Sequence, residues 1–548
     1  MTGLHAERSL PRSARFKGVL AALVAAVVAY GCSSSTTPEP LPPNTSGWWR
    51  DKVVYEIFVR SFADSDGDGV GDLQGLTAHL DYLNDGDPST NTDLGVDAVW
   101  LTPIHPSPSY HGYDVTDYRS VNPAFGTLTD FDAFVAGAHQ RGIKVILDMV
   151  LNHSSRQHPW FVNSQTGDTA AKRNWYVWSA TDPGWRSPFS GGKVWYPLNG
   201  AYYYGLFSST MPDLDLGTAE VEAELVSTMK FWLAHGVDGF RLDAVRHYFE
   251  SSTGVLVDQP ETHAFLKRIR RALQETYPQT LLVGEAWTTV ETVATYYGEG
   301  DEVQLSFSFD LADAIKSSIP AGDCSAVSSV LTRLDAALAG KDRGFDAPFL
   351  SNHDQVRTMR ALGADAAAAR VAAATLFALP GTPFLYYGEE IGMQGGPATD
   401  DRQKRTPFRW NSDAGHGFTS GSPWTDATEA PGVDVATQQA DPTSLWNLYR
   451  RLLALRHDQS ALAKGEVGVP ALHDAGPGIL ALVRTDAGKR VLFVTNFATT
   501  PSGPFAVALG GVPDVLLSEG LSAPPAAASG EVGFPGLDAR GFAFVSLQ

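Results

Sequence analysis

The sequence predicts an α/β fold: a (β/α)8 TIM barrel with an insert after its third strand and an antiparallel β-sandwich at the C-terminus. Short apolar segments recur at wide spacing, and stretches with helical periodicity, such as 219–236 and 264–277, lie between them. Strands that alternate with helices form parallel βαβ units, which can close into a barrel. The apolar segments are 53–59, 96–104, 143–150, 237–245, 281–287, 345–354 and 382–390, with an eighth strand near 305–310.

Two regions do not follow this alternation. Residues 154–213 are long, irregular and aromatic, and an unstructured stretch of that length inside a domain is usually functional. After about residue 463, the segments 478–486 and 490–498 have the pattern of antiparallel strands joined near turns. We therefore expect the barrel over 48–462, the insert over 154–213 and a separate sandwich over 463–548.

The N-terminus resembles a bacterial lipoprotein signal. Basic residues up to Lys17 precede the apolar run 19–30, which is too short to span a bilayer because a spanning helix needs about 20 apolar residues. We predict a signal over 1–32 with Cys32 as the lipidated residue, and a Ser/Thr/Pro tether over 33–47. The expected location is outside the cytoplasm, on a membrane in the periplasm or at the cell surface. Ordinary cleavage with secretion, or a short membrane anchor, is the alternative.

Composition narrows the range of partners. The formal net charge of −20 argues against nucleic acid, because phosphate binding needs clustered Lys and Arg. The chain has 2 cysteines. If Cys32 carries lipid, Cys324 has no disulfide partner, and we expect it to fill space in the core. We expect a monomer that contacts a membrane only through the lipid at Cys32.

The segment 64–72, DSDGDGVGD, has the composition of a calcium site. Its aspartates alternate with small residues, and its glycines let the chain bend so that oxygen atoms converge. An EF-hand would need a glutamate where Gly75 stands and would follow a helix, whereas VVYEIFV (53–59) favours a strand. We predict a metal-pinned loop after a strand, with a solvated acidic turn as the alternative. The expected ligands are Asp64, Asp66, Asp68, the Val70 carbonyl and Asp72.

Polar residues follow several of the expected strands, and reacting groups in such barrels lie at the C-terminal strand ends. Arg241 and Asp243 are two positions apart, so their side chains point to the same side, and the guanidinium favours an ionised carboxylate that could act as a nucleophile. Glu285 lies between LLVG and Trp287, and apolar surroundings raise a carboxyl pKa, which suits a general acid. Glycoside cleavage needs two carboxyls tuned in this opposed way. Structural ion pairs are the alternative.

Four segments resemble the signature regions of the α-amylase family of retaining glycoside hydrolases: DMVLNH (148–153), GFRLDAVRH (239–247), GEAW (284–287) and SNHD (351–354). The resemblance covers nearly the whole chain from Trp48. It implies that Asp243 is the nucleophile, that Glu285 is the acid and later the base, and that Asp354 stabilises the transition state. The residues that it implies for substrate binding are His111, Tyr113, His153, Arg241, Arg246, His247 and His353.

The resemblance also implies calcium. The loop 64–72 resembles the first-loop calcium site of oligoglucosidase-like members of the family. A second site on the cleft side would use Asn152, Asp213 and the His247 carbonyl. We expect the first ion to stabilise the fold rather than to react.

Local features distinguish members of the family. Ala244 resembles the small residue of α-1,4-specific enzymes, and Arg246–His247 resembles the Lys–His pair of amylases. Tyr110-His111 replaces an acidic residue of exo-acting glucosidases, whereas MPDLD (211–215) resembles a group intermediate between oligoglucosidases and neopullulanases. We expect an α-amylase that cleaves starch or maltodextrins internally. The alternatives are an α-glucosidase or oligo-1,6-glucosidase, a neopullulanase-like enzyme, a transglycosylase, or a non-catalytic glucan-binding protein.

Overall fold

The structure is a computed structural model that describes residues 47–341, 346–397 and 399–548. The predicted signal over 1–32, its Cys32, and the predicted tether up to residue 46 lie outside the described residues. Within the described ranges, the search for a helix of sufficient length and hydropathy to cross a membrane finds none.

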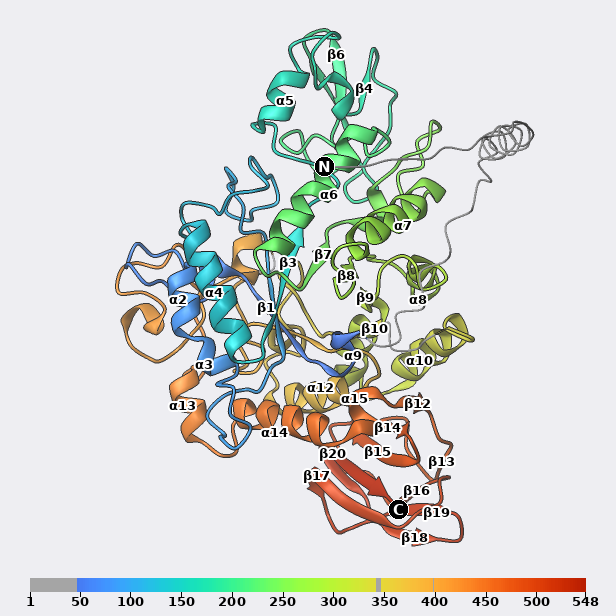
Figure 1. The fold of residues 1–548 in the computed structure, drawn as a ribbon. Helices are drawn as coiled ribbons and strands as arrows, with labels where there is room; N and C mark the ends of the chain where they lie inside the picture. The colour runs from blue at the N-terminus through green and yellow to red at the C-terminus, as the bar shows by residue number, and fades with distance from the viewer. Residues whose placement is uncertain (1–46, 342–345, 398) are drawn as a thin grey trace, which may run out of the picture. The chain divides into compact units, whose positions relative to one another are not determined.

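Eight parallel strands form the predicted barrel (Figure 1). Their order is β10-β9-β8-β7-β3-β2-β1-β11, and a parallel bridge between Phe349 and Phe384 joins the two edges. The strands are shorter than the apolar segments of the sequence, because the residues that follow each strand turn into the loops that carry polar side chains. The strands are β1 (Val54–Ile57), β2 (Ala98–Leu101), β3 (Lys144–Met149), β7 (Gly239–Leu242), β8 (Leu281–Gly284), β9 (Leu305–Phe307), β10 (Asp346–Ala347) and β11 (Phe384–Tyr386).

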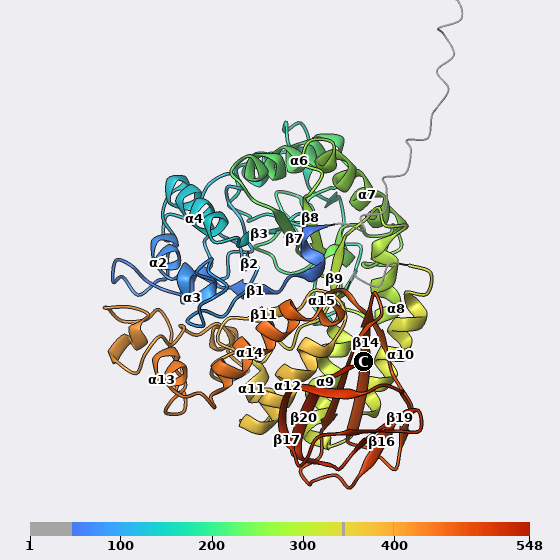
Figure 2. The same cartoon turned by 60° about the horizontal axis from the view of Figure 1, so that its bottom comes forward.

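Helices surround the strands, as Figure 2 shows for α4, α6 and α7. Local sequence fixes where they begin: Thr127 and Asp130 form a capping box at α4, and Pro260 is the first residue of α7. The longer helices are α4 (Leu128–Gln140), α6 (Ala219–Ala234), α7 (Pro260–Gln274), α9 (Phe309–Ala321), α10 (Ser325–Ala337), α12 (Ala366–Ala378) and α14 (Leu445–Asp458). The shorter ones include α2 (Leu73–Ala78), α3 (Leu80–Leu83), α8 (Val290–Val293), α11 (Thr358–Ala361), α13 (Val435–Ala440) and α15 (Ser460–Lys464).

Alternate strand residues build two cores. One set fills the barrel, where buried Trp100 packs beside Phe307 and Phe384. The other set, which includes Tyr55 and Phe240, packs against the helices. Successive side chains of a strand point to opposite faces of the sheet. A polar residue of the inner set therefore points into the barrel or toward its mouth. Arg241 is such a residue, and its guanidinium lies 5.3 Å from the Trp100 ring.

The insert after β3 folds into a small unit of its own. It contains α5 (Pro159–Ser164) and an antiparallel sheet of β4 (Trp178–Ser179), β6 (Ala201–Tyr204) and β5 (Trp195–Leu198). Trp175 and Trp195 are buried, and Trp178 stacks on Phe161 at 5.7 Å. Most of its tryptophans therefore pack the insert.

Two antiparallel sheets form the C-terminal sandwich and pack face to face through Leu492, Val545, Phe505 and Val532. Cys324 is buried against it and donates its thiol to the Ile479 carbonyl at 3.2 Å. The first sheet contains β12 (Glu466–Gly468), β14 (Ile479–Asp486), β15 (Lys489–Asn496), β20 (Leu537–Leu547) and β17 (Pro513–Leu521). The second contains β13 (Leu472–His473), β16 (Phe505–Val507), β19 (Glu531–Phe534) and β18 (Ala526–Ala528).

Two buried arginines join this sandwich to the barrel. Arg484 on β14 donates to the carbonyls of Ala378 and Leu379 at the end of α12, and Arg456 on α14 donates to those of Phe377 and Leu379. The last carbonyls of a helix have no hydrogen-bond partner within the helix and carry partial negative charge. In these contacts they balance the charges of Arg456 and Arg484 in place of carboxylates.

Candidate active site

The C-terminal ends of the barrel strands converge on a cleft of about 700 Å³. Most of the predicted catalytic and binding residues line it, whereas Arg241 and His353 lie buried beneath. The lining residues are His111, Tyr113, His153, Ser187, Phe189, Ser190, Phe207, Met211, Asp243, Ala244, Arg246, His247, Glu285, Trp287, Asp354 and Arg405.

Arg241 is the centre of the site. Its Nη1 lies 2.7 Å from Asp243 Oδ1 and 2.9 Å from Asp148 Oδ1, and its Nη2 lies 2.8 Å from Glu285 Oε2. The arginine is fully buried at the end of β7, between β3, which carries Asp148, and β8, which precedes Glu285. The alternation of the strand places Arg241 and Asp243 on one side, as predicted.

Ala244 turns the chain directly after Asp243. Its backbone has φ 50° and ψ 40°, in the left-handed region that side chains with branched Cβ atoms avoid. This conformation aims its N–H at Glu285 Oε2, at 2.9 Å. The small side chain of Ala244 therefore permits the turn, and the Ala244 N–H helps to hold the Glu285 carboxyl.

Burial shifts the pKa of two carboxyls that contact Arg241, those of Glu285 and Asp148. Burial raises the pKa of Glu285 to about 7, although the Arg241 charge opposes this rise and the Asp243 charge adds to it. Burial likewise raises the pKa of Asp148 to about 6 against the same guanidinium. Near neutral pH, Glu285 can therefore hold a proton, as a general acid requires.

His353 connects Asp354 to the barrel. Its Nδ1 lies 2.5 Å from Glu56 Oε1 and its Nε2 lies 3.0 Å from Asp354 Oδ2. Burial opposes a charge on His353, but these two carboxylates raise its pKa to about 10. Desolvation raises the pKa of Asp354, whose side chain is 33% exposed, but the charges of His353 and Arg405 lower this pKa by more, so Asp354 is ionised in the cleft. Arg405 Nη2 lies 2.9 Å from Asp354 Oδ1.

Tyr113 and two histidines complete this side of the cleft. The Tyr113 hydroxyl accepts from His353 Nε2 at 2.5 Å and donates to Asp148 Oδ2 at 3.0 Å, while its ring stacks on His353 at 5.6 Å. His153 lines the cleft, and its buried Nε2 has no hydrogen-bond partner among the described residues. The ring of His111 stacks on Tyr113 at 6.1 Å. We name His111, Tyr113, His153, Asp354 and Arg405 the Asp354 side.

Half of the residues on the opposite side of the cleft are apolar. We name this set the Phe189 side: Ser187, Phe189, Ser190, Phe207, Met211, Arg246, His247 and Trp287. Arg246 and His247, which were predicted to bind substrate, lie on this side, and several of their nitrogen atoms have partners within the protein. Arg246 Nε lies 2.9 Å from Asp258 Oδ1 and its Nη1 donates to the Trp287 carbonyl at 2.8 Å. His247 Nδ1 contacts the Leu256 carbonyl at 2.9 Å.

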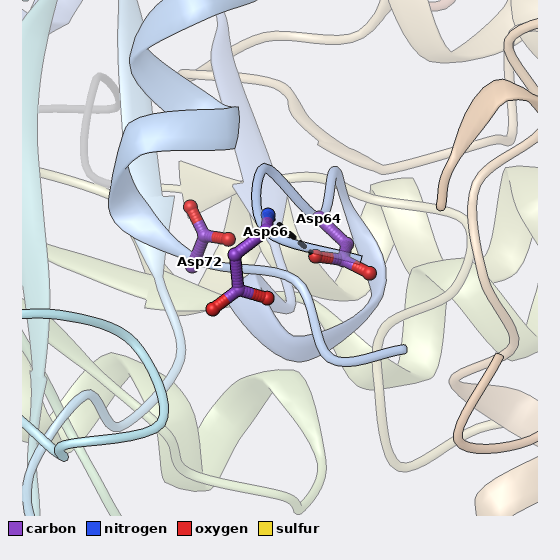
Figure 3. Close-up of side chains that lie close together, drawn as sticks. All are labelled: Asp64, Asp66 and Asp72. Atoms are coloured by element: carbon purple, nitrogen blue, oxygen red, sulfur yellow. Dashed lines mark hydrogen bonds between the residues drawn. The ribbon is translucent and has the colours of Figure 1, made fainter. Parts of the chain in front are cut away.

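The acidic loop lies away from these lining residues. Figure 3 shows Asp64, Asp66 and Asp72 side by side, and each offers a carboxylate oxygen within 4.8 Å of the others. Asp68, a predicted ligand, is not part of this group, and its carboxylate accepts the Val70 N–H at 2.7 Å. The Asp64 carboxylate also accepts from the N–H groups of residues 66, 67 and 69, which rigidly shapes the loop. This donor set is all oxygen, the type that calcium prefers.

The residues of the predicted second metal site lie together in part. Asn152 donates its amide to Asp213 Oδ2 at 2.8 Å, and the Leu206 N–H donates to Asp213 Oδ1 at 2.9 Å. Burial raises the pKa of Asp213 to about 7. These hydrogen bonds satisfy the carboxylate without an ion.

Known proteins resemble this chain in fold and sequence. The family model for the α-amylase catalytic domain matches residues 56–465. The chain belongs to the α-amylase family. It is 39% identical over 425 residues to Alpha-amylase 3 of Dictyoglomus thermophilum, with 77% of this chain and 80% of that protein covered. It is 34% identical over 528 residues to a probable α-glucosidase of Rhizobium meliloti, covering 85% and 92%.

A solved structure gives the same result. The crystal structure of an α-amylase from H. orenii matches with a TM-score of 0.82 and 37% identity, covering 91% of this chain and all of that one. The protein is therefore an enzyme of the glycosidase type, with the barrel and C-terminal β domain of the α-amylase family.

The sequence did not identify several residues of the site. Asp148 and Glu56 lie inside segments whose pattern predicts strands, and each is a carboxylate among mainly apolar neighbours, which is a usable signal. Arg405 lies 51 positions from Asp354, so nothing local predicts their contact. Phe189 and Phe207 lie in the irregular insert, where no periodicity assigns a direction to a side chain.

Removal of Arg241 tests its central position. Arg241→Met should lower the free energy of unfolding at pH 7 by about 3–5 kcal/mol, because it leaves buried carboxyls without a counter-charge. The loss should be smaller at pH 5. The pKa values of Asp148 and Glu285 are already raised by burial and would rise further, and a raised carboxyl pKa costs stability as pH increases through it. Chemical denaturation at both pH values measures this.

A matched control is Arg268→Met, which removes the exposed pair between Arg268 and Glu222 on the barrel surface. Exposed pairs contribute about 0–1 kcal/mol. Equal losses for the two variants, or a loss for Arg241→Met that is independent of pH, would contradict the assignment of Arg241 as the counter-charge of the site.

Proposed function

We propose that this enzyme is an α-amylase, which cleaves internal α-1,4-glucosidic bonds of starch and maltodextrins with retention of configuration. The observation that carries the proposal is the placement of Asp243 and Glu285 on one guanidinium, with Asp354 ionised in the same cleft. Retaining hydrolysis needs two carboxyls close together, about 5–5.5 Å apart, with one ionised and one protonated.

Each group has a role in the proposed reaction. Asp243, oriented by Arg241, attacks the anomeric carbon, while Glu285 donates its proton to the leaving oxygen. Glu285 then removes a proton from the water that hydrolyses the glycosyl-enzyme. Asp354, which His353 holds in place, binds the hydroxyls of the distorted sugar, and the Tyr113 ring supports its face. His153, which lines the cleft, makes a further contact with the same sugar.

Specificity for internal α-1,4 bonds rests on local residues. Ala244 has no branch at Cβ and leaves room beside Asp243 and Glu285. Tyr110 offers no carboxylate of its own to grip a chain end. A curated relative named an α-amylase, 39% identical, supports this member of the family.

A chain-end α-glucosidase is the second candidate, and one cluster favours it. Asp401 pairs with Arg405 at 3.0 Å and accepts the Tyr110 hydroxyl at 2.7 Å, beside Asp354. Asp401 thus brings a carboxylate to the Asp354 side from another part of the chain. If this cluster closes the cleft, only a terminal sugar can enter.

Product analysis on a maltoheptaoside blocked at its non-reducing end decides between them. The α-amylase proposal predicts blocked fragments of intermediate length. The α-glucosidase candidate predicts that the blocked substrate stays intact while the unblocked one releases glucose. Asp401→Ala serves as the matched variant: it should leave the products unchanged under the first proposal, and it should allow internal cleavage to appear under the second.

The pH profile tests the role of Glu285. Its protonated form is the active acid, so kcat/KM should fall as pH rises through about 7, where burial places its pKa. An exposed glutamate, with a pKa near about 4.3, would lose activity two to three pH units lower. The measurement is kcat/KM on maltoheptaose from pH 4 to 9. A basic limb below pH 5.5 would contradict the assignment.

We propose that calcium binds the acidic loop through Asp64, Asp66 and Asp72, and that it stabilises the fold. Oxygen donors on a loop bent at Gly67 and Gly69, both with positive φ, suit this ion. Asp66 is exposed. Removal of its carboxylate should therefore lower the stability of the metal-free protein only slightly. The second site at Asn152, Asp213 and the His247 carbonyl is not needed for this proposal.

Chelation checks the metal site. EDTA should lower the Tm of the enzyme by about 5 °C, since a ligand at about 100 times its Kd stabilises by about 2.7 kcal/mol. Asp66→Ala should have the Tm of the EDTA-treated wild type, whether or not EDTA is present. Asp87→Ala, which changes another exposed turn aspartate, should respond to EDTA as the wild type does. Coincident wild-type melting curves in EDTA and in calcium would rule the site out.

We further propose that the enzyme is exported and anchored as a monomer through lipid on Cys32. The basic start, short apolar run and tether support this proposal. A lipid-modified N-terminal peptide in the membrane fraction, lost in Cys32→Ser, is the expected finding.

A further inference from the structure

A second cavity, of about 490 Å³, lies where the C-terminal sandwich meets the barrel. Pro380 and Gly381, which precede strand β11, line it from the barrel, and the last residues of β14 line it from the sandwich. Because the chain enters β11 from Gly381, this cavity is at the N-terminal ends of the barrel strands. The active-site cleft is at their C-terminal ends, so the two cavities are on opposite faces of the barrel.

Basic side chains outnumber acidic ones around this cavity. The basic residues are Arg50, Lys341, Lys464 and Arg484, and the acidic ones are Glu466 and Asp486. The whole chain has a formal net charge of −20, so a local excess of cations is contrary to its average. Clustered cations create a positive potential that attracts anions.

Arg484 is the buried member of this group, and a second buried arginine lies next to it. Arg484 and Arg456 both donate to the Leu379 carbonyl. Within the part of the chain that the structure describes, all their other hydrogen-bond acceptors are main-chain carbonyls too, those of Phe377, Ala378, Gly381, Ala463 and Gly465. Arg456 Nε is buried and has no partner among the same residues.

These carbonyls compensate the two arginines only in part. A helix C-terminus carries about half of an elementary negative charge, whereas each guanidinium carries a full positive charge. Burial lowers the pKa of Arg484, and the Arg456 charge lowers it further. Burial also lowers the pKa of Arg456 to about 10, although Asp97 and Asp51 oppose this. A buried charge without full compensation destabilises a protein, so an anion beside Arg484 would be stabilising.

We propose that this cavity binds a small phosphate monoester, with Arg484, Lys464 and Arg50 as the cations that hold its phosphate. Arginine presents paired N–H groups that match phosphate oxygens, and the lysine ammonium adds a further charge. Arg484 Nη2 carries two hydrogens and makes one hydrogen bond, to the Gly465 carbonyl at 2.6 Å, so one N–H remains for the ligand. A monoester has about 1.5 to 2 negative charges at pH 7, which matches four cations that face two carboxylates.

The remainder of the ligand should carry hydroxyl groups. The cavity is larger than a phosphate ion requires, and its volume is within the range of small-molecule sites, about 300–1,000 Å³. Glu466, Thr485 and Asp486 add hydrogen-bond acceptors to the lining. A phosphorylated polyol or sugar combines the anionic and the hydroxyl-bearing parts that this lining fits. The proposal does not depend on which glucan the active site cleaves.

Calorimetric titration of the full chain at pH 7 tests the site, with sodium chloride holding the ionic strength constant. The probe is glycerol 3-phosphate, a monoester. Glycerophosphoglycerol is a diester with the phosphate of a lipid headgroup, and glycerol carries no phosphate. We expect saturable binding of the monoester at one site, weaker binding of the singly charged diester and no binding of glycerol.

Substitutions assign the binding to this cavity. Lys464→Gln removes an exposed cation that pairs with Asp51 at 3.4 Å, and it should weaken the monoester by about two- to fivefold, the size of one exposed ion pair. Arg484→Lys keeps the charge and removes the fork, and it should weaken the monoester by about tenfold. Lys464→Gln keeps the test valid if Arg484→Lys does not fold, because its side chain is on the surface.

Lys267→Gln is the matched control. Lys267 is also an exposed lysine with one aspartate partner nearby, Asp301 at 3.3 Å, but it lies on α7, outside the cavity lining. Its substitution should leave the affinity for the monoester unchanged.

Three results would overturn the proposal. Absence of saturable binding by the monoester would rule out the site, and equal affinities of Lys464→Gln, Lys267→Gln and wild type would place the binding elsewhere. A diester that binds more tightly than the monoester would replace the monoester by a lipid headgroup phosphate. Cleavage of maltoheptaose enters none of these outcomes, so they are independent of the α-amylase proposal.

Discussion

The contacts of one buried guanidinium determine the geometry of the active site. Arg241 is fully buried and binds Asp148, Asp243 and Glu285, which come from or follow three neighbouring strands. Three carboxyls at one point would repel one another and would each cost desolvation energy. The planar fork of arginine can meet several carboxyl oxygens in fixed directions, which the point charge of lysine cannot do. The strand ends β3, β7 and β8 are therefore held together by the same interaction that aims the reacting groups.

The balance of charge around Arg241 explains where protons reside. Four cations face six carboxyls: Arg241, His353, Lys404 and Arg405 face Glu56, Asp148, Asp243, Glu285, Asp354 and Asp401. Burial raises the pKa of Asp148 to about 6 and that of Glu285 to about 7. When these two are protonated, four carboxylates remain for four cations. The general acid is thus produced by the charge of the whole site, not by the surroundings of Glu285 alone.

This balance also shows how far a sequence can be interpreted. The strand and helix pattern predicted the barrel, and the polar ends of its strands predicted Asp243, Glu285 and Asp354, because period and position are local properties. The contacts that tune these groups are not local. Glu56 reaches His353 across 297 positions, and Arg405 reaches Asp354 from a segment without regular structure. The sequence alone could therefore assign a raised pKa to Glu285 from Trp287 and its apolar neighbours, but not the Asp243 charge that contributes to it.

The loop DSDGDGVGD (64–72) takes no part in the proposed reaction. A series of contacts nevertheless connects it to the residues that support the active site. The Gly69 carbonyl accepts the Trp424 N–H at 2.9 Å, and Asp64 accepts the Thr419 hydroxyl. Trp424 stacks on Tyr110 at 5.4 Å, and the Tyr110 hydroxyl donates to Asp401, the partner of Arg405.

A shift of this loop would therefore displace residues that support one wall of the cleft. Asp64, Asp66 and Asp72 form the one group of carboxylates, within the part of the chain that the structure describes, that lies close enough to hold an ion, and their mutual repulsion works against an ordered loop. A divalent cation there would remove that repulsion and fix Trp424 behind Tyr110. On this physical ground, an ion that takes no part in the chemistry can still set the position of the arginine that pairs with Asp354.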